Sequence, residues 1–104
     1  MVASCIEAAF DRTTRNRGLL GRDRLEPGTA LILAPCNAIH TWFMRFPIDV
    51  AFVRRDGRIV KAVANLRAWR LAASFRAFAV VELPAGVLAA TDTGAGDELR
   101  LSAD

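Results

Sequence analysis

Short apolar stretches separated by turn-forming residues run along the chain, and they indicate strands rather than long helices. In residues 48–53 the even positions hold Ile, Val and Phe, which would line one face of a strand. Asp56 and Gly57 follow, and an Asp-Gly pair supplies the positive φ that a tight hairpin turn requires. Residues 59–66 return as a second, mostly apolar stretch. We therefore predict a β-hairpin with strands 48–53 and 59–66.

The remaining strands are predicted from apolar or alternating runs of strand length. They span residues 2–9, 30–34, 39–44, 75–83 and 98–102. A short helix is predicted after Asp11, ending near Leu20 and Gly21, and one helical turn is predicted over residues 87–90. Six or seven short strands with frequent turns predict a mainly β fold, a compact sandwich or barrel with one or two short helices.

Length and composition are those of a small globular protein. The 104 residues suit one domain over 1–104, and 53% hydrophobic against 24% charged residues excludes long disordered segments. No apolar run approaches the roughly 18 residues that span a bilayer, so no membrane span is expected. The first residues show no basic segment followed by an apolar stretch, so no signal peptide is predicted and the expected location is cytoplasmic.

Arginine supplies almost all of the positive charge. The formal net charge is +3, and Lys61 is the one lysine. Arginines cluster between Arg12 and Arg24, but Asp11 and Asp23 interrupt the cluster, and no aromatic side chains for base stacking lie between them. We interpret the cluster as a solvated surface, and no nucleic-acid partner is predicted.

The densest group of unusual side chains spans residues 36–49. Cys36, His40 and Asp49 offer S, N and O groups of the kind that bind Zn²⁺, but the spacing is not diagnostic and distant Cys5 would have to complete the set, so no metal is predicted. A Cys36 thiolate with His40 as base and Asp49 as orienting group would be coherent chemistry. In a strand, however, positions 36 and 40 lie about 13 Å apart, so no catalytic residue is assigned.

The same segment holds the candidate binding site, a shallow polar site formed by His40, Arg45, Asp49 and Cys36. Pro47 cannot donate to a sheet ladder, which predicts an edge or a bulge that would turn Arg45 and His40 into one concavity. Because Arg recognises carboxylates and phosphates bidentately, an anion would suit this site. The alternative is an Arg45–Asp49 ion pair that only holds the bulge in shape.

Two other features have alternative interpretations. Cys5 and Cys36 could form one disulfide, although two buried thiols are the commoner arrangement for so few cysteines. Trp69, flanked by Arg67 and Arg70, could be an exposed cation–π platform or a core ring with a polar rim. We favour the core ring.

Five short segments form a recognisable series. They are residues 17–22 (RGLLGR), 39–50 (which begins with IHT and ends with MRFPIDV), 56–60 (DGRIV), 82–86 (ELPAG) and 96–97 (GD). Together they resemble domain-of-unknown-function family 192, a small bacterial and archaeal family, over about residues 9–101. The resemblance implies a compact, mostly β domain with a short N-terminal helix, and it brings no established activity, cofactor or substrate. Members often have Phe-Trp-Met in place of Ile39, His40 and Thr41, so the resemblance implies no family-wide chemistry at His40.

The sequence therefore predicts a non-enzymatic accessory or ligand-binding β domain, with its site near residues 40–49, no cofactor, and a small ligand or a protein as partner. One alternative is an interaction module that docks through Trp42, Phe43 or Trp69 if these are exposed. The resemblance suggests a pilus- or secretion-type assembly as its context. A hydrolase that uses Cys36 and His40 is the less favoured alternative.

Overall fold

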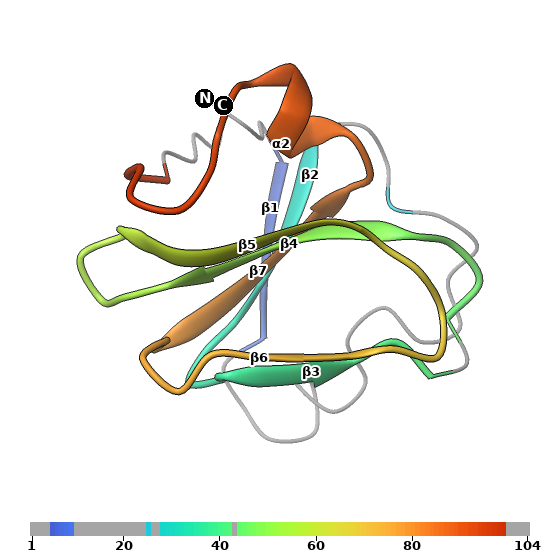
Figure 1. Cartoon of the computed structure of the whole chain (residues 1–104), viewed down its shortest axis with the longest axis horizontal. Helices are drawn as coiled ribbons and strands as arrows, with labels where there is room; N and C mark the ends of the chain where they lie inside the picture. Colours follow the sequence, from blue (N-terminus) through green and yellow to red (C-terminus); the bar gives the residue numbers. More distant parts are fainter. Residues whose placement is uncertain (1–4, 10–24, 26–27, 43, 100–104) are drawn as a thin grey trace.

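Seven strands and one short helix make up the regular structure in the computed structural model, which describes residues 5–9, 25, 28–42 and 44–99. In chain order they are β1 (Cys5–Ala9), β2 (Thr29–Leu33), β3 (Ala38–His40), β4 (Ile48–Val53), β5 (Ile59–Leu66), β6 (Leu71–Ala73), β7 (Ala79–Pro84) and α2 (Val87–Ala90). The prediction of a mainly β fold is confirmed (Figure 1).

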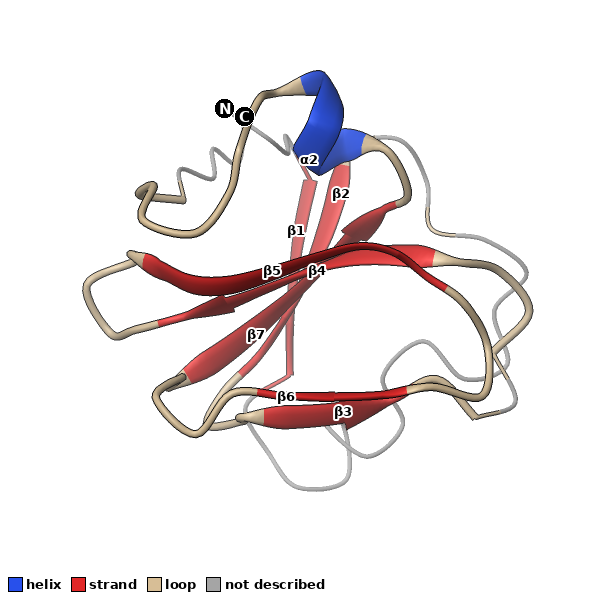
Figure 2. Cartoon of the chain, viewed as in Figure 1, coloured by secondary structure: helices blue, strands red, loops and turns tan. Residues whose placement is uncertain are grey.

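The strands form two sheets of unequal size. Five strands lie in the order β1-β2-β7-β4-β5, and β3 and β6 pair antiparallel as a separate small sheet. In the large sheet β1 and β2 are parallel, and the other neighbours are antiparallel. Figure 2 shows the small sheet on one side of the large sheet and α2 on the other. The arrangement is sandwich-like rather than a closed barrel.

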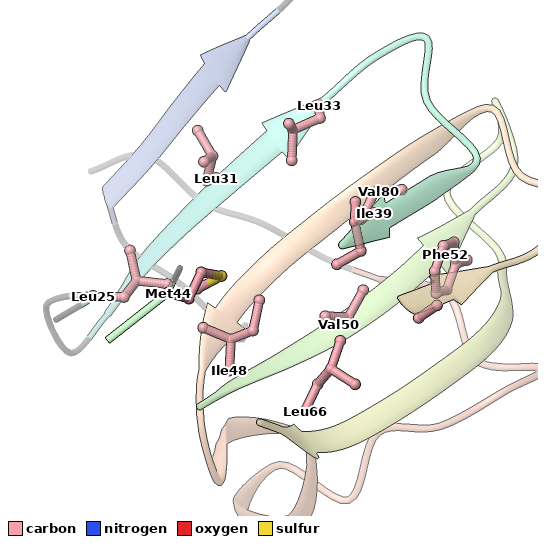
Figure 3. Close-up of a cluster of buried hydrophobic side chains, with 11 residues drawn as sticks. Leu25, Leu31, Leu33, Ile39, Met44, Ile48, Val50, Phe52, Leu66 and Val80 are labelled. Carbon is pink, nitrogen blue, oxygen red and sulfur yellow. The ribbon is translucent and has the colours of Figure 1, made fainter. Parts of the chain in front are cut away.

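The core between the two sheets is built from alternate residues of several strands (Figure 3). The large sheet contributes Val50, Phe52 and Val80, while Ile39 and Ala72 face them from the small sheet. Burial of such side chains is worth roughly 1.5–3 kcal/mol each for the larger ones, which is what joins the short β3–β6 pair to the large sheet.

A second apolar cluster covers the opposite face of the large sheet. Ala51 and Val53 alternate with the residues of the first core, and Val81 and Leu83 of β7 join them. Leu88 of α2 packs against this cluster. All six residues of β4 are therefore buried, because the strand lies in the interior of the sheet and is covered on both faces.

The hairpin of β4 and β5 has the bounds that the sequence predicts. Gly57 has a φ of 88°, and its N–H donates to the carbonyl of Arg54 at 2.9 Å. The Asp56 carboxylate accepts the backbone N–H of Arg58 at 2.9 Å, which fixes the turn from the other side. The predicted helical turn over residues 87–90 is also confirmed, as α2.

Other predicted bounds are wrong in informative ways. β3 ends at His40 rather than residue 44, and β7 begins at Ala79 rather than residue 75, because a turn occupies residues 74–78. The sequence did not predict β6, which has three residues and only one buried side chain, at Ala72. Of the expected strand 98–102, the described part makes a single bridge, from Glu98 to Arg58.

The expected N-terminal helix and the arginine cluster lie outside the described residues. In the ranges that are described, no helix has the length and apolar character needed to cross a membrane.

Candidate functional site

Asp49 is buried inside the fold on the helix side of the large sheet. Its side chain is fully buried, with Oδ1 accepting the N–H of Asn65 at 2.9 Å and Oδ2 accepting the N–H of Leu88 at 2.8 Å. One carboxylate thus ties the end of β5 and the first turn of α2 to β4. A buried carboxylate in this position satisfies two backbone donors that would otherwise lack partners.

The predicted irregularity near Pro47 is real, but it lies on the neighbouring strand. Ile48 pairs with Leu66 and Val50 pairs with Val63, so β5 holds one residue more than β4 over this interval. Asn65 has a φ of 53° within that bulge, which presents its N–H to the Asp49 carboxylate. Of the two predicted alternatives at Pro47, an edge or a bulge, the edge does not apply, because β4 lies between β7 and β5.

His40 lies in the small sheet, on the other side of the large sheet from Asp49. Its neighbour Ile39 points into the core, so His40 points outward and is exposed, as is Leu71 directly opposite it on β6. The His40 ring stacks on Trp42, with ring centroids 4.7 Å apart. The structure therefore separates His40 from Asp49, and the two do not share a concavity.

Thr41 connects the end of β3 to the loop between β5 and β6. Its fully buried hydroxyl donates to the carbonyl of Arg67 and accepts the N–H of Arg70 at 2.9 Å. The backbone N–H of Thr41 also donates to the carbonyl of Arg70, and its carbonyl accepts the N–H of Trp69. The sequence alone did not indicate this role for Thr41. The one available signal was a lone polar residue within an apolar, aromatic stretch.

The loop that Thr41 holds brings a second tryptophan to the small sheet. Trp69 has a φ of 63° and is 58% exposed, so the preferred interpretation of a core ring is wrong. Trp42 is 46% exposed and Leu71 is 70% exposed. We call His40, Trp42 and Leu71, with Trp69 at their border, the outer face. Exposed apolar groups gathered in this way are typical of interaction sites.

Within residues 38–42 and 44–73, the charged side chains near the outer face include three exposed arginines. Arg45 follows Trp42 by three residues, and Arg67 and Arg70 flank Trp69 in the loop fastened to Thr41, all three being exposed. Within residues 28–42 and 44–99, the exposed acidic side chains belong to the β4–β5 turn and to the segment after α2. They are Asp56, Asp92, Asp97 and Glu98. The outer face is therefore bordered by arginines and set apart from these carboxylates.

Cys36 lies apart from the outer face, in the connection between β2 and β3. It is a half-buried thiol whose Sγ donates to the carbonyl of Ala38 at 3.2 Å, which excludes a Cys5–Cys36 disulfide in this structure. Pro35, Cys36 and Asn37 line a cavity of about 230 Å³ together with Ala77 and Phe78. Within the described ranges, no three His, Cys, Asp or Glu side chains gather closely enough to hold a metal ion.

Two solved structures share this fold. One is a crystal structure from Sinorhizobium meliloti 1021 described as a "putative transcription regulator", 24% identical, with a TM-score of 0.83 over 91% of this chain and 79% of that chain. The other is a protein of unknown function from Novosphingobium aromaticivorans DSM 12444, 23% identical, with a TM-score of 0.80 over 89% of this chain and 71% of that one. At such identities the likeness concerns the fold alone.

No curated protein matches the chain. The model of the DUF192 family, described as an uncharacterized ACR, matches residues 2–101. That match spans almost the whole sequence and agrees with the resemblance of the five sequence segments. The chain therefore belongs to the DUF192 family.

Proposed function

We propose that this protein is a non-enzymatic binding domain that docks an acidic segment of a partner protein on its outer face. The observation that carries the proposal is the exposed His40–Trp42 stack, opposite Leu71 on a sheet bordered by arginines. Carboxylates of the partner would meet the guanidinium groups of Arg67 and Arg70, which bind carboxylates bidentately. Apolar side chains between those carboxylates would cover Trp42 and Leu71.

The composition of the outer face favours a protein partner over a single-stranded nucleic acid. Trp and Arg are the residues that most often dominate binding energy at protein interfaces. Nucleic-acid platforms, in contrast, leave aromatic rings open for bases to stack on. Here the Trp42 ring already stacks on His40 at 4.7 Å, and the residue opposite is Leu71, an aliphatic side chain with no ring for a base.

The loop that carries Trp69 and two of the arginines is held in place before any partner arrives. Thr41 bonds the residues on both sides of Trp69 through its hydroxyl and backbone groups. A surface ordered in the free protein loses less conformational entropy on binding than a loose one. This supports the outer face as the binding surface and assigns Thr41 the role of positioning it.

Two of the four residues of the predicted site, Asp49 and Cys36, lie away from the outer face. Asp49 is enclosed by the backbone donors of Asn65 and Leu88 and is unable to meet a ligand at the outer face. Cys36 lines a separate cavity. Of the four sequence candidates, His40 and Arg45 remain in the proposed surface, His40 as part of the aromatic stack and Arg45 as a cation at its border.

Intrinsic tryptophan fluorescence tests the proposal directly, because the chain has two tryptophans and no tyrosine. Trp42 belongs to the outer face and Trp69 borders it, so any emission change reports on that surface. We expect a saturable change on titration with a short peptide that alternates Glu and Leu, weakening as salt rises because screening reduces charge pairing. The same peptide with Gln in place of Glu is the matched probe and should bind much more weakly.

Variants locate the binding. Trp42→Ala and Arg70→Ala should each weaken peptide binding by about tenfold, measured by calorimetry so that loss of a fluorophore does not matter. Phe75→Ala is the matched control, because Phe75 is 92% exposed but lies in the β6–β7 turn. Equal binding of the Gln peptide, equal losses in Phe75→Ala, or tighter binding of an oligothymidylate would each overturn the proposal.

A further inference from the structure

A hollow opens at the opposite end of the small sheet, between the β4–β5 turn and the β6–β7 turn. Its volume is about 450 Å³, and it is lined by Arg54, Arg55, Asp56, Arg76, Ala77 and Phe78. We call it the arginine hollow. None of these residues belongs to the outer face, so an inference here stands independently of the proposed function.

The walls of the arginine hollow are held by the backbone. The N–H of Phe78 donates to the carbonyl of Val53 at 2.8 Å, and the carbonyl of Phe78 accepts the N–H of Cys36 at 2.9 Å. The Ala77 N–H closes the β6–β7 turn by donating to the carbonyl of Ser74 at 3.0 Å. The cations therefore stand on turns whose positions are fixed by the sheet rather than on loose loops.

The charge of the arginine hollow is unbalanced. Arg54 approaches the Asp56 carboxylate at 3.6 Å, and the Arg55 guanidinium lies 4.4 Å from the centre of the Phe78 ring. The backbone N–H of Arg58 and the guanidinium of Arg54 both lower the pKa of Asp56, so its carboxylate is ionised at neutral pH. Three guanidinium groups against one carboxylate leave an excess of two positive charges among the lining residues.

The arginine hollow shares two apolar lining residues with the cavity beside Cys36. Ala77 and Phe78 line both the hollow and the cavity of about 230 Å³ that holds Pro35, Cys36 and Asn37. A ligand that reaches from one to the other would have a charged end among the arginines and an uncharged body beside Ala77, toward Cys36.

From this geometry we infer that the arginine hollow binds a phosphate monoester with a small apolar body. A monoester carries about −1.5 to −2 charges near neutral pH, which matches the excess of two positive charges better than a single carboxylate does. Arg55 and Arg76 hold the phosphate oxygens, because Arg54 is engaged with Asp56. The body of the ester lies beside Ala77 and the edge of Phe78, since Arg55 covers the face of that ring.

Calorimetric titration of the full chain with phenyl phosphate tests this inference. Phenyl phosphate should bind more tightly than inorganic phosphate, which lacks the apolar body, and more tightly than phenyl sulfate, which has a single negative charge. Arg76→Ala and Arg55→Ala should each weaken phenyl phosphate by about tenfold, the usual effect of losing a charged hydrogen-bond donor. Arg76→Lys, which keeps the charge but not the planar fork, should fall in between.

Arg70→Ala is the matched control, since Arg70 is an exposed arginine outside the arginine hollow. It should leave phenyl phosphate binding unchanged, just as Arg76→Ala should leave binding of the Glu-Leu peptide unchanged. The inference is overturned if phenyl phosphate does not bind the wild-type chain, if inorganic phosphate binds equally well, or if Arg76→Ala and Arg70→Ala weaken it to the same extent.

Discussion

The two sides of the large sheet use polar residues in opposite ways. On the helix side, Asp49 is fully buried, and both of its carboxylate oxygens accept backbone N–H groups. On the side of the small sheet, Thr41 is equally buried, but it fastens a loop whose tryptophan and arginines remain in solvent. Asp49 therefore holds buried backbone segments together, whereas Thr41 holds an exposed loop in position.

Within residues 40–49, one end of the segment belongs to the proposed binding surface and the other end to the buried core. Residues 40–49 looked like a single site in the sequence, yet the chain passes from the small sheet to the large sheet between His40 and Asp49. Figure 1 shows β3 and β4 in different layers. We therefore expect substitutions at Asp49 to change stability, and substitutions at the outer face to change binding.

The largest effect should come from Asp49→Asn. The amide keeps one oxygen as acceptor, but its NH₂ group meets the second backbone N–H, so a buried donor faces a donor. We expect a loss of about 2–3 kcal/mol in the free energy of unfolding, measured by urea denaturation. Where the variant is folded, its affinity for the Glu-Leu peptide should equal that of the wild type. A stable Asp49→Asn protein with weakened peptide binding would contradict the claim that Asp49 acts on stability and not on binding.

Thr41→Val should affect both stability and binding. The valine keeps the shape but leaves the carbonyl of Arg67 and the N–H of Arg70 without their hydroxyl partner, at a cost of about 1–2 kcal/mol. Because the loop then moves more freely, peptide affinity should also fall. Thr41→Ser restores the hydroxyl and should recover most of both losses. If Thr41→Val lowers stability alone, the positioning role is wrong.

Trp42→Ala should leave stability nearly unchanged. The ring is 46% exposed and its stacking partner His40 is itself exposed, so we expect a change within about 0.5 kcal/mol. A change of more than about 2 kcal/mol in thermal or urea unfolding would mean that the outer face belongs to the core after all. Trp42→Ala should therefore lower peptide affinity about tenfold with little change in stability, whereas Asp49→Asn should lower stability and leave peptide affinity unchanged.

The smallest effect concerns Asp56, an exposed carboxylate that also accepts a backbone N–H. The N–H of Arg58 lowers its pKa in the folded protein below the ordinary value of 3.8. Its stabilising effect is therefore present above pH 3.8 and is lost as the pH falls through the lowered folded pKa. We expect a slightly smaller loss of stability for Asp56→Asn than for the wild type on acidification through that range, measured by urea unfolding at a series of pH values. A larger loss in the variant would contradict this sign.

The sequence predicted the elements whose signals are local. The β4–β5 hairpin follows from alternation and an Asp-Gly turn, and α2 follows Gly86, whose φ is 97°. β6 escaped prediction because three residues carry little periodicity, and its pairing with β3 depends on contacts distant in sequence. The separation of His40 from Asp49 escaped for the same reason, because a change of layer between neighbouring strands leaves no local pattern.

The solvent exposure of individual side chains was also not predictable from the sequence. Trp69 resembles a core ring by composition alone, yet the hydrogen bonds of Thr41 hold its backbone at a φ of 63°, with the ring in solvent. The arginine hollow combines two turns, residues 54–56 and 76–78, which lie 20 residues apart in the chain, so no local sequence motif predicts it.

Hydrogen–deuterium exchange with and without the Glu-Leu peptide tests the central claim most directly, because it reports on both sides of the sheet in one experiment. The account predicts slower exchange in residues 38–42 and 67–73 when the peptide is present. It predicts no change in residues 86–93, which surround the Asp49 contact with α2. Slower exchange confined to residues 86–93, with none at the outer face, would contradict the account.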